Sequence, residues 1–127
     1  MTIRLSFDED SLWQALVTAL RARGIDVQTA LDAAMIERTD ADYLVCATTP
    51  GRVLCSCNVG ACSRLHTHYR AQHKAHTGII LARQPQYAVG AHMRRLLRLI
   101  AHRTAEEMQN RVEFLRAWSK VSDERTQ

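Results

Sequence analysis

Short runs of apolar residues alternate with longer amphipathic stretches along this chain. Residues 3–7 alternate apolar and polar side chains, which predicts a strand with one buried face, and residues 11–23 then carry apolar side chains at helical spacing. Gly24 supplies the left-handed conformation that commonly ends a helix. Residues 25–29 alternate again, so the first thirty residues predict a strand, a helix and a second strand.

The same alternation continues through the rest of the chain. Residues 52–57 and 78–82 are short apolar runs of the kind buried in parallel sheets, and turn-forming Gly or Pro residues lie beside them. Between them we expect a helix rich in arginine and histidine over residues 60–73, and residues 89–102 predict a long amphipathic helix. We expect the inner face of this last helix to consist of Met93, Leu96, Leu97 and Ile100.

Two capping boxes indicate further helix starts. Thr39-Asp-Ala-Asp42 predicts a helix that runs to about Thr48, and Thr104-Ala-Glu-Glu107 predicts one more helix near the end of the chain. The secondary structure of two segments is not decided by the sequence. Residues 30–36 fit a short helix or a turn, and residues 112–118 fit a strand or a helix.

Strands that alternate with helices predict a three-layer α/β/α fold with a mainly parallel central sheet. A length of 127 residues matches one domain large enough to bury a core, and the chain has no internal repeats or glycine-rich linkers. We therefore expect a single domain over residues 1–118 and a polar tail over residues 119–127.

Composition sets further limits. No apolar stretch approaches the roughly 20 residues that a membrane helix needs, so no membrane contact is expected. The first residues have neither the apolar core nor the cleavage pattern of a signal peptide, which makes a cytoplasmic location the expectation. In that compartment we expect the cysteines to be reduced core residues. They are Cys46, Cys55, Cys57 and Cys62.

The net charge of +4 favours polyanionic partners only weakly, because the excess of basic residues is interpreted as spread over most of the chain. The densest basic stretch lies on the predicted helix over residues 89–102 and just beyond it. A solvated helix face and an RNA-binding surface are both open interpretations of this stretch. Its members are Arg94, Arg95, Arg98 and Arg103.

Acidic and amide side chains follow the predicted strands or begin the helix that leads into one. In a parallel α/β layer, helix N-termini and strand carboxyl ends share one edge, so these groups should converge. Carboxylates gathered in this way repel one another unless a divalent cation neutralises them, and hard oxygen ligands suit Mg²⁺ or Mn²⁺. Such an ion could activate water and bind phosphate oxygens. The converging residues are Asp8, Glu9, Asp10, Asp40, Asp42 and Asn58.

A simpler interpretation assigns most of these acids to helix capping. Asp10, Asp40 and Asp42 all lie at predicted helix starts, where a carboxylate accepts hydrogen bonds from backbone N–H groups and complements the helix dipole. Asp8 differs from them because it directly follows the first strand, before the cap.

Five fragments follow one another along the chain in a characteristic order. They are Leu5-Ser-Phe-Asp-Glu-Asp10, Leu20-Arg-Ala-Arg-Gly-Ile-Asp-Val27, Thr39-Asp-Ala-Asp-Tyr-Leu44, Gly51-Arg-Val-Leu-Cys-Ser-Cys-Asn58 and His76-Thr-Gly-Ile-Ile-Leu81. This order resembles that of small stand-alone PIN-like domains, and the similarity covers about residues 3 to 103. Such domains are similar to the toxin nucleases of toxin–antitoxin pairs, which cleave RNA with acidic residues and Mg²⁺.

The resemblance implies that Asp8 and Asp40 are two acids of a Mg²⁺ or Mn²⁺ site. The sequence differs from the family pattern at the third acidic position. Members of the family usually have Asp at the places where this chain has Asn58 and Ala61-Cys62. Asn offers a carbonyl oxygen but has no negative charge and cannot act as a base.

The first hypothesis is a metal-dependent ribonuclease in which Asp8 and Asp40 hold the ion and Asn58 orients the ion or a water. Glu9, Asp10 and Asp42 would be reserve ligands. The alternative is a degenerate PIN-like domain that binds RNA or a protein without cutting. The resemblance also implies an antitoxin protein or a second copy of the chain as partners.

A third hypothesis assigns structural zinc to the thiols and imidazoles of residues 55–68, although Cys55-Ser-Cys57 lacks the turn of a zinc knuckle. Core burial is the simpler interpretation of these cysteines. At a helix start, Cys62 could have a depressed pKa. The remaining histidines are expected mostly at the surface, and they are His73, His76, His92 and His102.

Overall fold

A computed structural model describes residues 1–8, 14–30, 32, 39–82 and 89–118. The predicted tail and most of the open segment 30–36 lie outside these residues. The elements are β1 (Leu5–Phe7), α1 (Gln14–Ala22), β2 (Val27–Thr29), α2 (Asp40–Thr48), β3 (Val53–Ser56), α3 (Val59–Ala71), β4 (Ile79–Leu81), α4 (Val89–His102), β5 (Val112–Phe114) and the 3₁₀ helix η2 (Leu115–Trp118).

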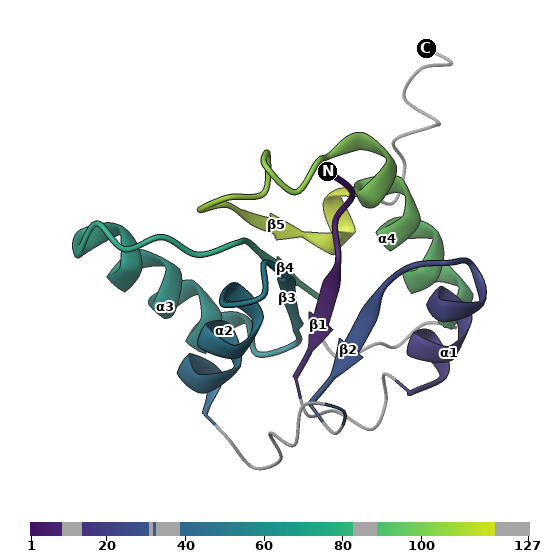
Figure 1. Ribbon diagram of the computed structural model, residues 1–127, viewed down its shortest axis with the longest axis horizontal. Helices are drawn as coiled ribbons and strands as arrows, with labels where there is room; N and C mark the ends of the chain where they lie inside the picture. Colours follow the sequence, from purple (N-terminus) through teal and green to yellow (C-terminus); the bar gives the residue numbers. More distant parts are fainter. Residues whose placement is uncertain (9–13, 31, 33–38, 83–88, 119–127) are drawn as a thin grey trace.

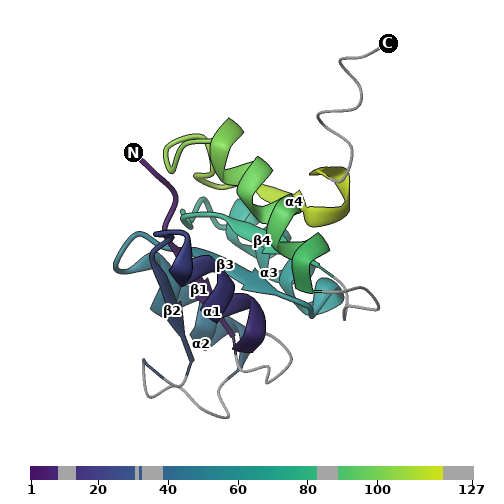
Figure 2. The same cartoon turned by 90° about the vertical axis from the view of Figure 1, so that its right-hand side faces the viewer.

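The five strands form one parallel sheet in the order β2-β1-β3-β4-β5. Helices α1 and α4 cover one face, and α2 and α3 cover the other (Figures 1 and 2). The predicted three-layer α/β/α fold is therefore confirmed. The chain direction across the sheet reverses between β1 and β3, and the carboxyl ends of such strands are where ligand sites form in doubly wound sheets.

Alternation along the strands divides their side chains between two apolar clusters. Leu5 and Phe7 of β1 belong to the cluster under α1 and α4, whereas Leu54 of β3 belongs to the cluster under α2 and α3. Because successive strand residues point to opposite faces, Ser6 and Asp8 fall on the α2/α3 face. Ser6 is as buried as its neighbours, so the expectation of a first strand with only one buried face was wrong: helices cover both sides.

The bounds of α4 match the prediction, and Leu96 is buried as predicted, but the rest of the predicted inner face is not fully buried. The buried residues are His92, Leu96 and Leu99, whereas Met93, Leu97 and Ile100 lie partly buried at the margin of the α1/α4 cluster. The helix is thus rotated from the predicted orientation.

None of the helices in the described part of the chain has the length and apolar character that a membrane span requires.

The second capping box forms without the predicted helix. Thr104 N donates to Glu107 Oε1 at 2.8 Å and Glu107 N donates to Thr104 Oγ1 at 3.1 Å, yet residues 105–110 form turns. Asn110 then adopts a φ of 60°, and β5 follows in parallel pairing with β4. Pairing with a distant strand overrides the local helix signal, and residues 112–118 contain both a strand and a 3₁₀ helix.

Candidate functional site

A chain of hydrogen bonds crosses the carboxyl edge of the sheet from Asp8 to Asp40. Ser56 Oγ donates to Asp8 Oδ2 at 2.7 Å, and the backbone N–H of Asn58 donates to Ser56 Oγ at 3.1 Å. Asn58 Nδ2 donates in turn to Asp40 Oδ2 at 2.8 Å. Two acids that are far apart in the sequence therefore share one edge, joined through Ser56 and Asn58.

Local structure explains the position of each group. Asp8 follows β1 on the α2/α3 face and is buried, with 9% of its surface exposed. Ser56 ends β3 on the same face, and Asn58 is the N-cap of α3, where its Oδ1 accepts from Ala61 N at 3.4 Å. Asp40 is the first residue of α2, and its carboxylate lies against Asn58.

The predicted capping box at the start of α2 is confirmed. Thr39 Oγ1 accepts from Asp42 N at 3.1 Å, and Asp42 Oδ2 accepts from Thr39 N at 3.4 Å. Asp42 thus makes the capping contact that the simpler interpretation assigned to it, while Asp40 is the acid that faces the hydrogen-bonded chain. Glu9 and Asp10 lie outside the described residues.

Ser56 is the member of this site that the sequence prediction missed. The alternation of the Val53–Ser56 strand, in which Leu54 and Ser56 share a face, is a signal that could have placed it beside Asp8. A serine in a run of otherwise buried apolar residues needs a hydrogen-bond partner, and Asp8 provides one.

The described residues do not fit the three-acid cation site that the family resemblance implies. The carbonyl oxygen of Asn58 accepts from the backbone of α3, and its amide nitrogen, a donor, is the group that meets Asp40. Among the described residues, no group of three or more His, Cys, Asp or Glu side chains is arranged to hold a metal. Two carboxylates and two neutral donors make up the edge.

Cys62 lies close to this edge but is not an activated thiol. It is fully buried in the α2/α3 cluster. Burial raises its pKa to about 11, opposed in part by a hydrogen bond with Ser56 and reinforced by the charges of Asp40 and Asp8. The expected depression of its pKa was wrong, because burial outweighs the helix N-terminus. Burial and the charge of Asp8 also raise the pKa of Cys55.

The sheet separates the cysteines of the zinc hypothesis. Cys55 and Cys57 belong to the α1/α4 cluster, whereas Cys62 belongs to the α2/α3 cluster. Their thiols therefore do not converge on one ion. None of Cys46, Cys55, Cys57 and Cys62 forms a disulfide bond.

Two histidines expected at the surface are buried. His76 and His92 are 1% and 3% exposed. Gly78 N donates to His76 Nδ1 at 3.0 Å, which leaves His76 Nε2 to donate to His66 Nδ1 at 2.9 Å. Burial, together with the neighbouring His66, lowers the pKa of His76 to about 4. This neutral pair ties α3 to the segment before β4.

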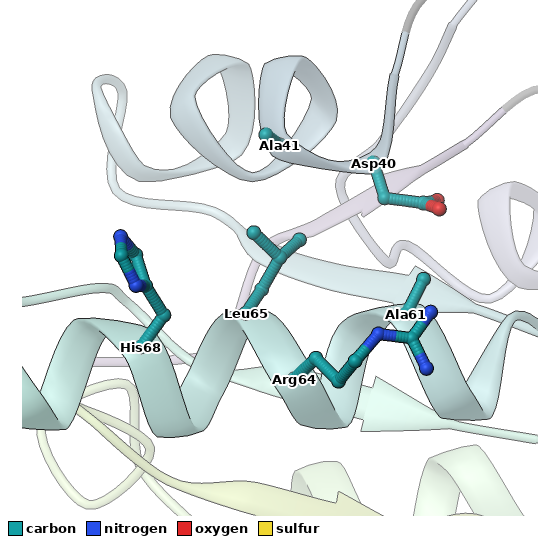
Figure 3. Close-up of a pocket in the computed structure, with 6 residues that line it drawn as sticks. All are labelled: Asp40, Ala41, Ala61, Arg64, Leu65 and His68. Atoms are coloured by element: carbon teal, nitrogen blue, oxygen red, sulfur yellow. The ribbon is translucent and has the colours of Figure 1, made fainter.

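A cavity of about 450 Å³ opens beside Asp40, between the first turn of α2 and the outer side of α3 (Figure 3). Arg64 and His68 are one helical turn apart on α3. The side chains of His68 and Leu65 point toward α2, and the Arg64 side chain extends along α3 toward Ala61 (Figure 3). A guanidinium next to the edge is suited to a phosphate oxygen. The lining residues are Asp40, Ala41, Ala61, Arg64, Leu65 and His68.

Contacts within the protein engage two arginines of the basic stretch on α4 and just beyond it. Arg98 Nη1 donates to Trp118 O at 3.1 Å. Arg103 pairs with Glu113 at 3.4 Å and lies 5.2 Å from the centre of the Trp118 ring. Trp118 itself is buried, with only 7% of its surface exposed.

The sequence matches no protein-family model, no curated protein and no solved structure.

Proposed function

We propose that this chain is a PIN-like domain that binds RNA without cleaving it. The observation that carries the proposal is the hydrogen bond from Asn58 Nδ2 to Asp40 Oδ2. An N–H group donates to Asp40 Oδ2 at the place where the family pattern calls for a third acid and a shared cation. Asn58 brings no negative charge and cannot accept a proton from water.

The hydrogen bonds to Asp8 and Asp40 at the carboxyl edge of the sheet support the same proposal. Hydrogen bonds to charged groups contribute about 1.5–3 kcal/mol each, and both Asp8 and Asp40 accept one from a neutral donor. The protein's own donors thus stabilise both acids of the polar chain. RNA is the proposed partner because the family resemblance implies it and because Arg64 lies in the cavity beside Asp40.

The proposal is tested by restoring the missing acids. Asn58→Asp, alone and combined with Ala61→Asp, should create Mg²⁺ or Mn²⁺ binding measurable by titration calorimetry, together with cleavage of a labelled single-stranded RNA. Ala61 lines the cavity with Asp40, so an acid at that position faces the edge. The matched control adds Asp8→Asn to the restored variant and should remove the gain.

A second candidate is the Mg²⁺-dependent ribonuclease that the resemblance implies. The observation in its favour is that Asp8 and Asp40 do share one edge of the sheet. The same assay separates the two candidates. If the wild-type protein cleaves RNA with Mg²⁺ and Asp8→Asn abolishes that cleavage, the non-cleaving proposal is wrong. An antitoxin-type protein and a second copy of the chain stay predictions of the resemblance.

A further inference from the structure

Acidic residues are absent from a long central part of the sequence. No Asp or Glu occurs between Asp42 and Glu106, although this segment holds all six histidines and more than half of the lysines and arginines. The excess positive charge is therefore concentrated rather than spread over the chain, contrary to the interpretation drawn from the total composition. Helix α3 lies wholly within this segment.

One cavity lies beside α3 and another lies at its C-terminal end. The cavity next to α2 contains Arg64 and His68, and a second cavity of about 330 Å³ lies beyond the end of α3. Its lining includes Arg70, His73 and Lys74 together with Asn110, which lies near β5. A ligand that occupies both cavities has to cross the exposed side of α3, a helix of 13 residues that is about 20 Å long.

The cations on this side of the molecule are available to a partner. Within the described part of the chain, no carboxylate lies in ion-pairing distance of Arg64, Arg70 or Lys74. The Lys74 ammonium lies 4.7 Å from the centre of the Tyr69 ring, a contact that leaves its charge uncompensated. Arg103, by contrast, is paired with Glu113. The outer side of α3 therefore offers more uncompensated positive charge than this end of α4.

Exposed imidazoles alternate with these cations. His68 follows Arg64 by one turn, and His73 lies between Arg70 and Lys74. Arginine and lysine side chains contact phosphates, and histidine rings offer stacking surfaces to unpaired bases. An acidic peptide would use the cations alone, whereas single-stranded RNA would use both groups. A single strand of RNA is also flexible enough to follow the exposed side of α3 from one cavity to the other.

We propose that the exposed side of α3, defined by Arg64, His68, Arg70, His73 and Lys74, is the contact surface for single-stranded RNA. The strand crosses α3 between the two cavities and reaches the edge at Asp40. This inference rests on the proposed function for its class of partner, and it assigns the contact to α3 rather than to the basic stretch of α4.

The test compares two variants that lose the same charge. R64Q/R70Q/K74Q removes the cations of the α3 surface, and R23Q/R94Q/R116Q removes three exposed arginines from the α1/α4 layer. Fluorescence anisotropy with labelled oligouridine at pH 8 measures the Kd of each variant over a range of salt concentrations. Circular dichroism melts check that both variants fold.

The α3 variant should bind oligouridine about tenfold more weakly or worse, and its plot of log K against log salt should become less steep by about 2, the change expected for three phosphate contacts on a single strand. The control variant should change the Kd by less than about twofold, since its charges lie away from the strand. His68→Ala combined with His73→Ala should weaken binding while leaving the salt slope unchanged, because stacking releases no counterions.

Other outcomes would overturn the inference. If both charge variants weaken oligouridine binding equally, the affinity depends only on the net charge of the protein and not on the α3 surface. Displacement of oligouridine by polyglutamate as effectively as by unlabelled RNA would assign the surface to acidic proteins. Failure of the wild-type protein to bind oligouridine would refute the surface and the proposed function together. If the wild type cleaves RNA and only the α3 variant loses binding, the surface stands and the non-cleaving proposal fails.

Discussion

The two faces of the sheet differ in what they bury. The α1/α4 face buries an apolar cluster that includes Leu5, Phe7 and Leu99. The α2/α3 face buries apolar residues too, but also Asp8 and Ser56, which begin the polar chain to Asp40. Because strand residues alternate, a single strand such as β1 supplies apolar side chains to one face and polar ones to the other. One face therefore contributes mainly stability, and the other combines stability with the site.

The largest effect is expected from a cavity in the apolar face. Leu99→Ala should lower the free energy of unfolding by about 2–5 kcal/mol, because Leu99 is fully buried between α4 and the sheet. Urea denaturation measures the loss, and the anisotropy assay should give an unchanged Kd for RNA. Val45→Ala, at a position that is 55% exposed on α2, is the control and should cost less than about 0.5 kcal/mol. A loss below about 1 kcal/mol for Leu99→Ala would contradict this division of roles.

A smaller effect is expected in the polar face from Ser56→Ala. The change removes a donor from buried Asp8 and an acceptor from the Asn58 N–H, which should cost about 1–3 kcal/mol. Urea denaturation of Ser56→Ala, Asp8→Asn and the double variant forms a double-mutant cycle. The cost of the double variant should fall short of the sum of the two single variants. Additive costs would show that the two side chains do not depend on each other.

The smallest effect near neutral pH is expected from the buried histidine pair. The pKa of His76 in the folded protein, about 4, lies below its ordinary value of 6.5, so the unfolded chain takes up the proton first as the pH falls. The stability associated with neutral His76 should be complete above pH 6.5 and should be lost progressively as the pH falls toward 4.

Urea denaturation at several pH values between 7 and 4 measures this loss. His76→Gln should flatten the pH dependence, whereas His102→Gln, at an exposed position, is the matched control. Equal pH dependence in wild type and His76→Gln would show that other groups cause the acid destabilisation.

Local signals predicted much of this fold correctly. The Thr39 capping box, the left-handed Gly24 and the bounds of α4 depend on residues that are neighbours in sequence. The helix expected after Thr104 did not form, because residues 105–110 form turns that lead into β5, and β5 pairs with β4, a strand more than thirty residues earlier in the chain. The buried residues of α4 also differ in part from the predicted ones, because contacts with α1 and the sheet orient that helix.

The pattern of residues was enough to place Asp8 and Asn58 directly after strands and Asp40 at a helix start, because strand ends and caps are short-range features. It could not show that the Asn58 amide turns its N–H toward Asp40, or that Ser56 joins the chain. It also could not show that His76 is buried. Each of these depends on side chains that come from different elements and meet only when the layers close over the sheet. Hydrogen bonding and burial at such points depend on distances between parts of the chain that no local pattern encodes.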